Sequence, residues 1–191
     1  MENGSIELGF DAAERRAFLL LAAGHLLFAA ALFTIAPLIR ENGLYAIAPL
    51  FGVPLALLGR GDRRLVRALV LVVGFGLIHY GAVYCAVKSV RVPFTGEGFT
   101  DSLWIPGAIG GLIGAAGSFA LCALAGLLRP GSRAMLAAGV AVLTAVGAVG
   151  VYMLMSRMGT TDGKGSVASY LFIYTPWQLA FAWFLAKLLR N

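Results

Sequence analysis

Two histidines are the residues with the clearest chemical potential in this sequence. His25 and His79 each lie inside a long uncharged stretch, and the chain has no other histidine. His25 follows Arg16 by nine residues and His79 follows Arg67 by twelve. At a helical rise of ~1.5 Å per residue, both imidazoles are expected about 14 to 18 Å from the same membrane face. A buried neutral imidazole needs hydrogen-bond partners or a metal to offset its desolvation.

Three interpretations of these histidines are open. In the first, both imidazoles are axial ligands of one haem b, the only metal that we would assign to them. The glycines that would give a macrocycle room are Gly24, Gly74, Gly76 and Gly81. In the second, they form a proton- or ligand-binding site in a transport path, with hydrogen-bond partners among Tyr80, Tyr84 and Gln178. In the third, each histidine bonds separately to carbonyls or tyrosine hydroxyls of neighbouring helices.

A row of aromatic residues in the last apolar stretch is a second candidate. Its members recur at helical spacing and share one face: Tyr170, Tyr174, Trp177, Phe181 and Phe184. Such a row either lines a site for a flat apolar ligand or packs against neighbours. Pro176 should kink this helix. Gln178 beside it needs a hydrogen-bond partner in hydrocarbon, so we expect it to face inward.

The elements that carry these residues are predicted to be membrane-spanning helices. Hydrophobic residues make up 60% of the 191, and charged residues only 13%, whereas soluble chains average roughly 45–50% and ~25%. We therefore predict an all-α integral membrane protein, a bundle of six transmembrane helices in a single polytopic domain, residues 1–191. The predicted spans are about 17–39, 44–58, 65–87, 104–128, 134–155 and 169–189.

The second of these spans is short and contains two prolines, Pro49 and Pro54. Fifteen residues make only ~22 Å of straight helix, so five spans plus a re-entrant segment is the alternative. If the segment crosses, ten of the fifteen Lys and Arg residues share one side of the membrane. The positive-inside rule then predicts six spans in a bacterial-type inner (plasma) membrane, with both termini cytoplasmic.

Two local patterns predict how the helices begin and pack. Asp11 and Glu14 have the spacing of a capping box, so a helix should start there. In the predicted fourth span, small residues recur at intervals of three and four: Gly107, Gly111, Gly114, Ser118 and Cys122. This spacing lets another backbone come close, which predicts a central helix packed inside the bundle rather than a dedicated dimer face.

The polar inventory limits the function classes. All acidic and basic residues fall in loops or at the ends of the predicted spans, so no catalytic residues can be named and no metal cluster is expected. The basic charge is spread over short loops, which is typical of membrane topology and does not indicate a nucleic-acid partner. We expect a protein of the lipid bilayer that binds or passes a small neutral or apolar molecule, or an accessory subunit with a membrane-protein partner or a second copy. A bis-histidine haem b redox protein is the alternative, its cofactor held by His25 and His79.

Overall fold

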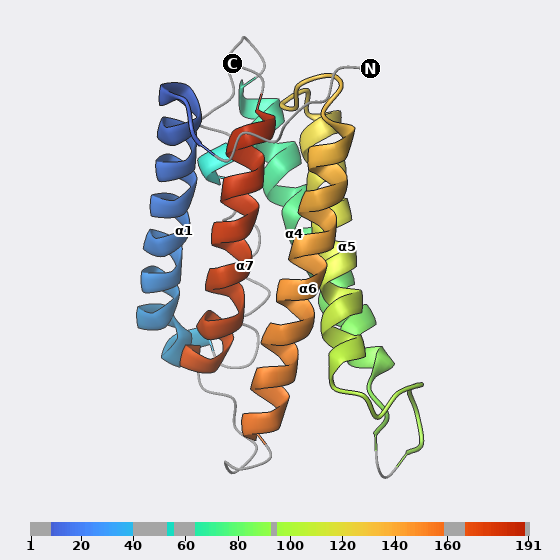
Figure 1. Cartoon of the computed structure of the whole chain (residues 1–191). Coiled ribbons are helices and arrows are strands. Elements are labelled where there is room, and N and C mark those ends of the chain that lie inside the picture. The colour runs from blue at the N-terminus through green and yellow to red at the C-terminus, as the bar shows by residue number, and fades with distance from the viewer. Residues whose placement is uncertain (1–8, 40–52, 56–63, 93–94, 159–166, 190–191) are drawn as a thin grey trace.

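The computed structural model describes residues 9–39, 53–55, 64–92, 95–158 and 167–189, and every structural statement below concerns these residues. They form five long helices and no β-strand (Figure 1). The helices are α1 (Ala12–Ile39), α4 (Arg64–Ser89), α5 (Trp104–Leu124), α6 (Arg133–Met158) and α7 (Val167–Leu188). Three stretches are long and apolar enough to cross a membrane: Leu65–Ser89, Trp104–Leu124 and Arg133–Ser156. The prediction of an all-helical membrane protein is therefore confirmed at this level.

The helices lie side by side along one axis (Figure 1). Neighbouring pairs pack in the order α4, α5, α6, α7, α1. Helices α1 and α4 run in the same direction, whereas α5, α6 and α7 alternate (Figure 1). The chain therefore leaves α1 at one end of the bundle and begins α4 at the other. The predicted span 44–58, which falls on this connection, lies outside the described residues except for 53–55, which are helical.

Helices α5 and α6 pack through glycine, as the small-residue spacing predicted. A Cβ atom added to Gly147 would lie 2.8 Å from the carbonyl oxygen of Gly107 and 2.9 Å from Cα of Gly111. A Cβ on Gly111 would in turn lie 3.0 Å from Cα of Thr144. The two backbones touch because no side chain stands between them. Where α5 begins and α6 approaches its end, the rings of Trp104 and Tyr152 stack with centroids 4.0 Å apart.

Alanine at Gly111 should destabilise the protein, because its methyl group would press into the backbone of α6. We expect a loss of about 1–3 kcal/mol in the free energy of unfolding. Gly81→Ala is the matched control, since a Cβ there meets nothing within 4 Å. Unfolding by SDS titration in mixed micelles measures both variants. Equal stability of the two variants would contradict a direct backbone contact between α5 and α6.

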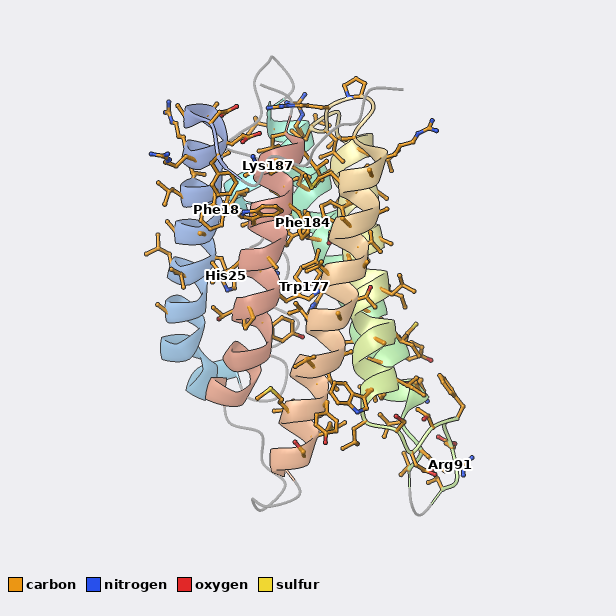
Figure 2. The ribbon with its side chains drawn as sticks, in the orientation of Figure 1. Phe18, His25, Arg91, Trp177, Phe184 and Lys187 are labelled. Atoms are coloured by element: carbon orange, nitrogen blue, oxygen red, sulfur yellow. The ribbon has the colours of Figure 1, made fainter. Side chains whose placement is uncertain are left out.

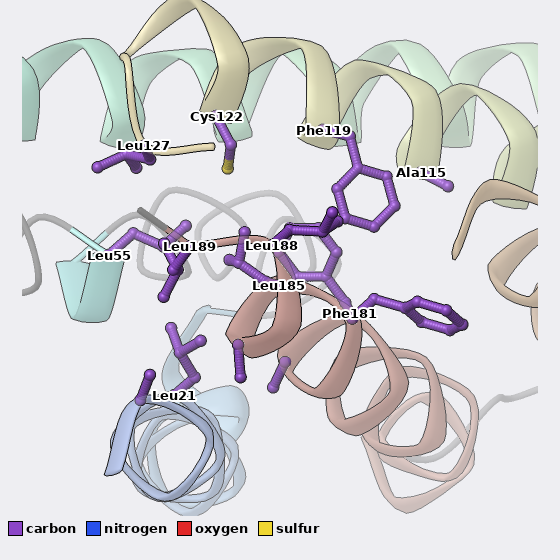
Figure 3. Close-up of a cluster of buried hydrophobic side chains, with 14 of the residues drawn as sticks. Leu21, Leu55, Ala115, Phe119, Cys122, Leu127, Phe181, Leu185, Leu188 and Leu189 are labelled. Atoms are coloured by element: carbon purple, nitrogen blue, oxygen red, sulfur yellow. The ribbon is translucent and has the colours of Figure 1, made fainter. Parts of the chain in front are cut away.

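The buried core gathers towards the end of the bundle where α7 finishes (Figure 3). Leu185 and Leu188 of α7 are fully buried, and they lie among Phe119 and Cys122 of α5 and Leu21 of α1. Four of these five side chains are apolar and bulky, so their burial contributes roughly 1.5–3 kcal/mol each where water is the reference. Helix α7 is thus the element around which α1 and α5 are held together.

A group of charged side chains lies at the same end, which we name the Glu14 end, and two of them are buried. Glu14 Oε2 lies 2.8 Å from Lys187 Nζ, and each side chain is only 8% exposed. Arg129, in the α5–α6 turn, lies 4.0 Å from Glu14 Oε1, and its Nε donates to the carbonyl of Leu189 at 2.6 Å. Glu14 also forms the predicted capping box with Asp11, at 2.7 and 3.1 Å. One carboxylate therefore ties the first helix to the last.

Removing one member of this pair should be costly, because the other charge stays buried. We expect Lys187→Met to lower the free energy of unfolding by about 3 kcal/mol. The double variant with Glu14→Gln should lose less than the sum of the two single changes. Asp101→Asn is the control, since the Arg91–Asp101 pair is 3.8 Å apart with side chains 53% and 77% exposed, and should cost under ~1 kcal/mol. Additive losses for Glu14 and Lys187 would contradict their coupling.

Candidate functional site

A cavity of about 130 Å³ lies among four helices, α4, α5, α6 and α7. On α4 its lining extends from Phe75 to Ala86, which is eleven residues or ~16 Å along the helix axis. The cavity is thus elongated and parallel to the bundle. The side chains with polar atoms that line it are His79, Ser118, Tyr174, Trp177 and Gln178. Among the described residues that line the cavity, none is acidic, lysine or arginine.

The cavity exists because glycines, which have no side chain, occupy the wall that α5 contributes. Gly110 and Gly114 line the cavity, together with Gly107, Gly111 and Gly147. A Cβ on Gly110 would lie 3.4 Å from Cβ of Ala86, and one on Gly114 would lie 3.4 Å from the Trp177 ring. Both distances are close to ordinary van der Waals contact, so alanine at either position would narrow the cavity without striking a backbone. Gly107 and Gly111 thus contact α6 and also line the cavity, whereas Gly110 faces α4 and Gly114 faces α7.

Aromatic rings form the part of the cavity wall that borders the buried core. Trp177 stacks on Phe181, with centroids 5.5 Å apart and planes 18° apart. Phe181 in turn contacts Phe75 of α4 and Phe119 of α5, with centroids 6.0 and 5.2 Å away. Part of the aromatic row predicted on α7 thus packs in the core, while Tyr174 and Trp177 face the cavity. The side chain of Tyr170 lies outside the described part of the structure.

Two polar side chains from opposite helices meet at the cavity. The Tyr174 hydroxyl of α7 lies 3.4 Å from Nε2 of His79 on α4, and the two rings have centroids 5.3 Å apart. This distance is at the long end of a hydrogen bond, so the pair is only loosely joined. Helices α4 and α7 are not neighbours in the packing order, and these two side chains bridge the gap between them.

Gln178 lies one helical turn beyond Tyr174 and lines the same cavity. It is 8% exposed, and the structure gives its side chain no hydrogen bond within the described residues. An amide without a partner in an apolar environment costs about 2–7 kcal/mol. The expectation that Gln178 faces inward agrees with this placement.

His25 lies in a different place from His79. It is buried between α1 and α7 (Figure 2) and lines a smaller cavity of about 20 Å³ with Pro54, Leu55 and Phe181. Gln178 lines both cavities. Axial ligation of one iron requires both imidazoles at the same macrocycle. Because the two histidines line separate cavities, the arrangement does not fit a bis-histidine haem.

The two tyrosines of α4 named as hydrogen-bond partners are placed elsewhere. Tyr80 and Tyr84 are 55% and 51% exposed, and their rings stack on each other with centroids 6.2 Å apart. They belong to the apolar outer face of α4, which also carries Leu69, Val73 and Leu77. The structure therefore brings together His79, Tyr174, Trp177 and Gln178 at the larger cavity, and leaves His25, Tyr80 and Tyr84 away from it.

Sequence reasoning did not foresee the contribution of Phe75 and of the glycine wall to this site. The signal for the glycine wall was present, because Gly110 and Gly114 form a second pair at four-residue spacing, offset from Gly107 and Gly111. Two such offset pairs cover two faces of a helix, of which a single neighbouring helix can fill one. The other face is then free to line a cavity.

No protein-family model, curated protein or solved structure matches this chain. The fold and the cavity themselves define a class. It is an all-helical protein with three helices able to cross a membrane and an elongated, uncharged cavity among four of its helices. Groups of three or more residues suited to hold a metal ion do not occur in the described part of the chain.

Proposed function

We propose that this membrane protein binds a small, uncharged and largely apolar molecule in the cavity between α4 and α7. The observation that carries the proposal is Gln178, a buried amide that faces the cavity without a hydrogen-bond partner in the described structure. In hydrocarbon, such a group is retained at a cost and marks a functional site. A ligand with one polar atom would remove that cost.

The size and lining of the cavity support the same class of molecule. A cavity of about 130 Å³ is comparable to an engineered cavity of ~150 Å³ that takes up benzene. Its walls are glycine, alanine, valine and aromatic side chains, with a few polar groups, which is the usual composition of a small-molecule pocket. A charged ligand would have no counter-charge there. Passage of the molecule across the membrane and an accessory role in a complex stay predictions.

The fluorescence of Trp177 offers a direct test with bromobenzene as the probe. In a protein with Trp104→Phe and Trp183→Phe, reconstituted in saturated-lipid nanodiscs, bromobenzene should quench Trp177 in a saturable way. Gly110→Ala should weaken this binding at least about tenfold, because its methyl group takes up part of the cavity. Gly81→Ala, whose methyl group meets nothing, should leave binding unchanged.

Trp183 serves as the reporter for partition into lipid alone, because it packs on Phe184 and Phe10 and does not line the cavity. With Trp183 as the single tryptophan, quenching should rise linearly with the bromobenzene concentration. Linear quenching of Trp177 as well, unaffected by Gly110→Ala, would show that the cavity takes up no apolar molecule and would overturn the proposal.

We also propose that the chain crosses an inner membrane six times with both termini in the cytoplasm. Ten of the fifteen basic residues then lie on the cytoplasmic side, as the positive-inside rule expects. The parallel directions of α1 and α4 support an extra crossing between them (Figure 1). In this topology the Glu14 end faces the cytoplasm and Arg91 lies on the outside.

Cysteine accessibility in whole cells tests this topology. In a background with Cys85→Ser and Cys122→Ala, a membrane-impermeant maleimide should label Arg40→Cys from outside and should not label Gly61→Cys until the membrane is opened. Arg91→Cys and Arg133→Cys calibrate the outer and inner signals, because both side chains are exposed at opposite ends of the bundle. Labelling of positions 40 and 61 from the same side would exclude six crossings.

A further inference from the structure

We propose that the ligand of this cavity is an apolar alcohol, a molecule with one hydroxyl group on an uncharged aliphatic body, and that Ser118 and Gln178 bind its hydroxyl. The inference rests on the proposed function and assigns the chemical class of its ligand. Two observations support it: a pair of buried polar side chains at one end of the cavity, and the apolar lining of the other end.

Ser118 of α5 is a second buried polar side chain at the cavity. It is 2% exposed and lines the cavity, and the structure gives its hydroxyl no hydrogen bond within the described residues. Serine and threonine in membrane helices commonly donate to a carbonyl of the preceding turn. The Ser89 hydroxyl does so at 2.7 Å from the carbonyl of Ala86. The Thr144 hydroxyl does so at 2.7 Å from the carbonyl of Val140. Because Ser118 lacks this bond, its hydroxyl is available to a ligand.

Ser118 and Gln178 lie at similar heights along the bundle. Helices α5 and α7 run in the same direction (Figure 1), and the rings of Phe119 and Phe181 meet with centroids 5.2 Å apart. Ser118 directly precedes Phe119 on α5. Gln178 precedes Phe181 by three residues on α7, so the heights of Ser118 and Gln178 differ by about the rise of two residues, ~3 Å. Since both line the same cavity, they form one polar position beside the buried core, which we name the Ser118–Gln178 position.

The hydrogen-bonding atoms of the Ser118–Gln178 position match a hydroxyl group. A ligand hydroxyl can donate to Gln178 Oε1, while its oxygen accepts from the Ser118 hydroxyl or from the Gln178 amide nitrogen. An ether or ketone oxygen only accepts, so Oε1 would stay without a donor, and a buried acceptor without a donor is destabilising. His79 and Tyr174 contact each other, and the proposal assigns neither of them to the ligand.

The other end of the cavity suits the aliphatic body of such a molecule. Towards Trp104 its lining consists of Ala82, Val83, Ala86, Pro106 and Val151. These side chains bear no polar atoms, so water gains no hydrogen bonds from them, whereas an aliphatic chain gains dispersion contacts. Water at the Ser118–Gln178 position would satisfy the polar groups and leave this end unfilled. An alcohol fills both ends with one molecule.

Two isomeric probes test the class of ligand: hexanol, and methyl pentyl ether, which has the same atoms and cannot donate a hydrogen bond. Each competes with bromobenzene for the protein in which Trp177 is the single tryptophan, and displacement restores the fluorescence of Trp177. With concentrations expressed per lipid, hexanol should bind at least about tenfold more tightly than the ether. In protein with Trp183 alone, which reports partition into lipid, neither probe should change the quenching by bromobenzene.

Variants locate the preference for the alcohol. Ser118→Ala should weaken hexanol binding about fivefold and leave ether binding unchanged, and Gln178→Leu should make the two probes equal. Ser89→Ala is the matched control, because it makes the same change at a buried serine that does not line the cavity, and should leave the preference intact. Saturable quenching by bromobenzene shows in each variant that the cavity is present. Ser118→Ala decides alone if Gln178→Leu does not fold.

The proposed function and the alcohol assignment fail differently. Linear quenching of Trp177 by bromobenzene would overturn both. Saturable quenching with equal displacement by the two probes, stronger displacement by the ether, or no displacement would overturn the alcohol and leave the apolar site in place. A preference for hexanol that Ser118→Ala leaves unchanged would also overturn the assignment, because the hydroxyl would then be bound elsewhere.

Discussion

The close approach of α5 to α6 is the constraint on which the rest of the structure depends. The backbones meet at Gly107, Gly111 and Gly147, where a Cβ atom has no room. This contact fixes the rotation of α5 about its own axis. Since glycines at the offset positions 110 and 114 then face away from α6, the same rotation turns bare backbone towards α4 and α7. The cavity is thus a consequence of how α5 packs on its neighbour.

The membrane environment gives polar groups in this fold a meaning that they would not have in water. The described charges that are buried, Glu14 and Lys187, satisfy each other at one end of the bundle and link its first and last helices. Gln178, deeper in the structure, has no such partner among the described residues. In a site without water, an amide of this kind either costs stability or binds something. Its place beside the Trp177 ring, at a cavity lined mostly by apolar side chains, is the basis on which we propose a small apolar ligand.

Much of the fold could be predicted from the sequence because lipid-facing helices have a strong signal. Uninterrupted apolar stretches predicted helices where α4, α5 and α6 lie, and the capping box of Asp11 and Glu14 predicted the start of α1. The glycine spacing predicted tight internal packing of α5. The pairing of Glu14 with Lys187 was out of reach, because the two are 173 positions apart and only the packing of α1 on α7 joins them.

The site was only partly predictable, for a related reason. Helical spacing along α7 grouped Tyr174 with Trp177, and the need of a buried amide for a partner predicted that Gln178 faces inward. The structure places all three at one cavity. The rotation of α4, however, depends on contacts across the bundle, such as that of Gly74 with Leu121 and Gly117 with Ile78. That rotation directs His79 inward and Tyr80 and Tyr84 outward. The sequence predicted a similar depth for His25 and His79, but depth along the axis does not by itself place two residues in one cavity.

The NMR signal of the Gln178 side-chain amide tests ligand binding in the cavity most directly, because Gln178 is the only glutamine in the chain. Protein labelled with ¹⁵N at glutamine side chains and held in nanodiscs should show one NH₂ pair of signals. On addition of bromobenzene we expect a saturable shift of this pair, because a probe bound in the cavity would lie beside the amide. An NH₂ pair that stays unchanged up to saturation of the lipid with bromobenzene would contradict a ligand bound at Gln178.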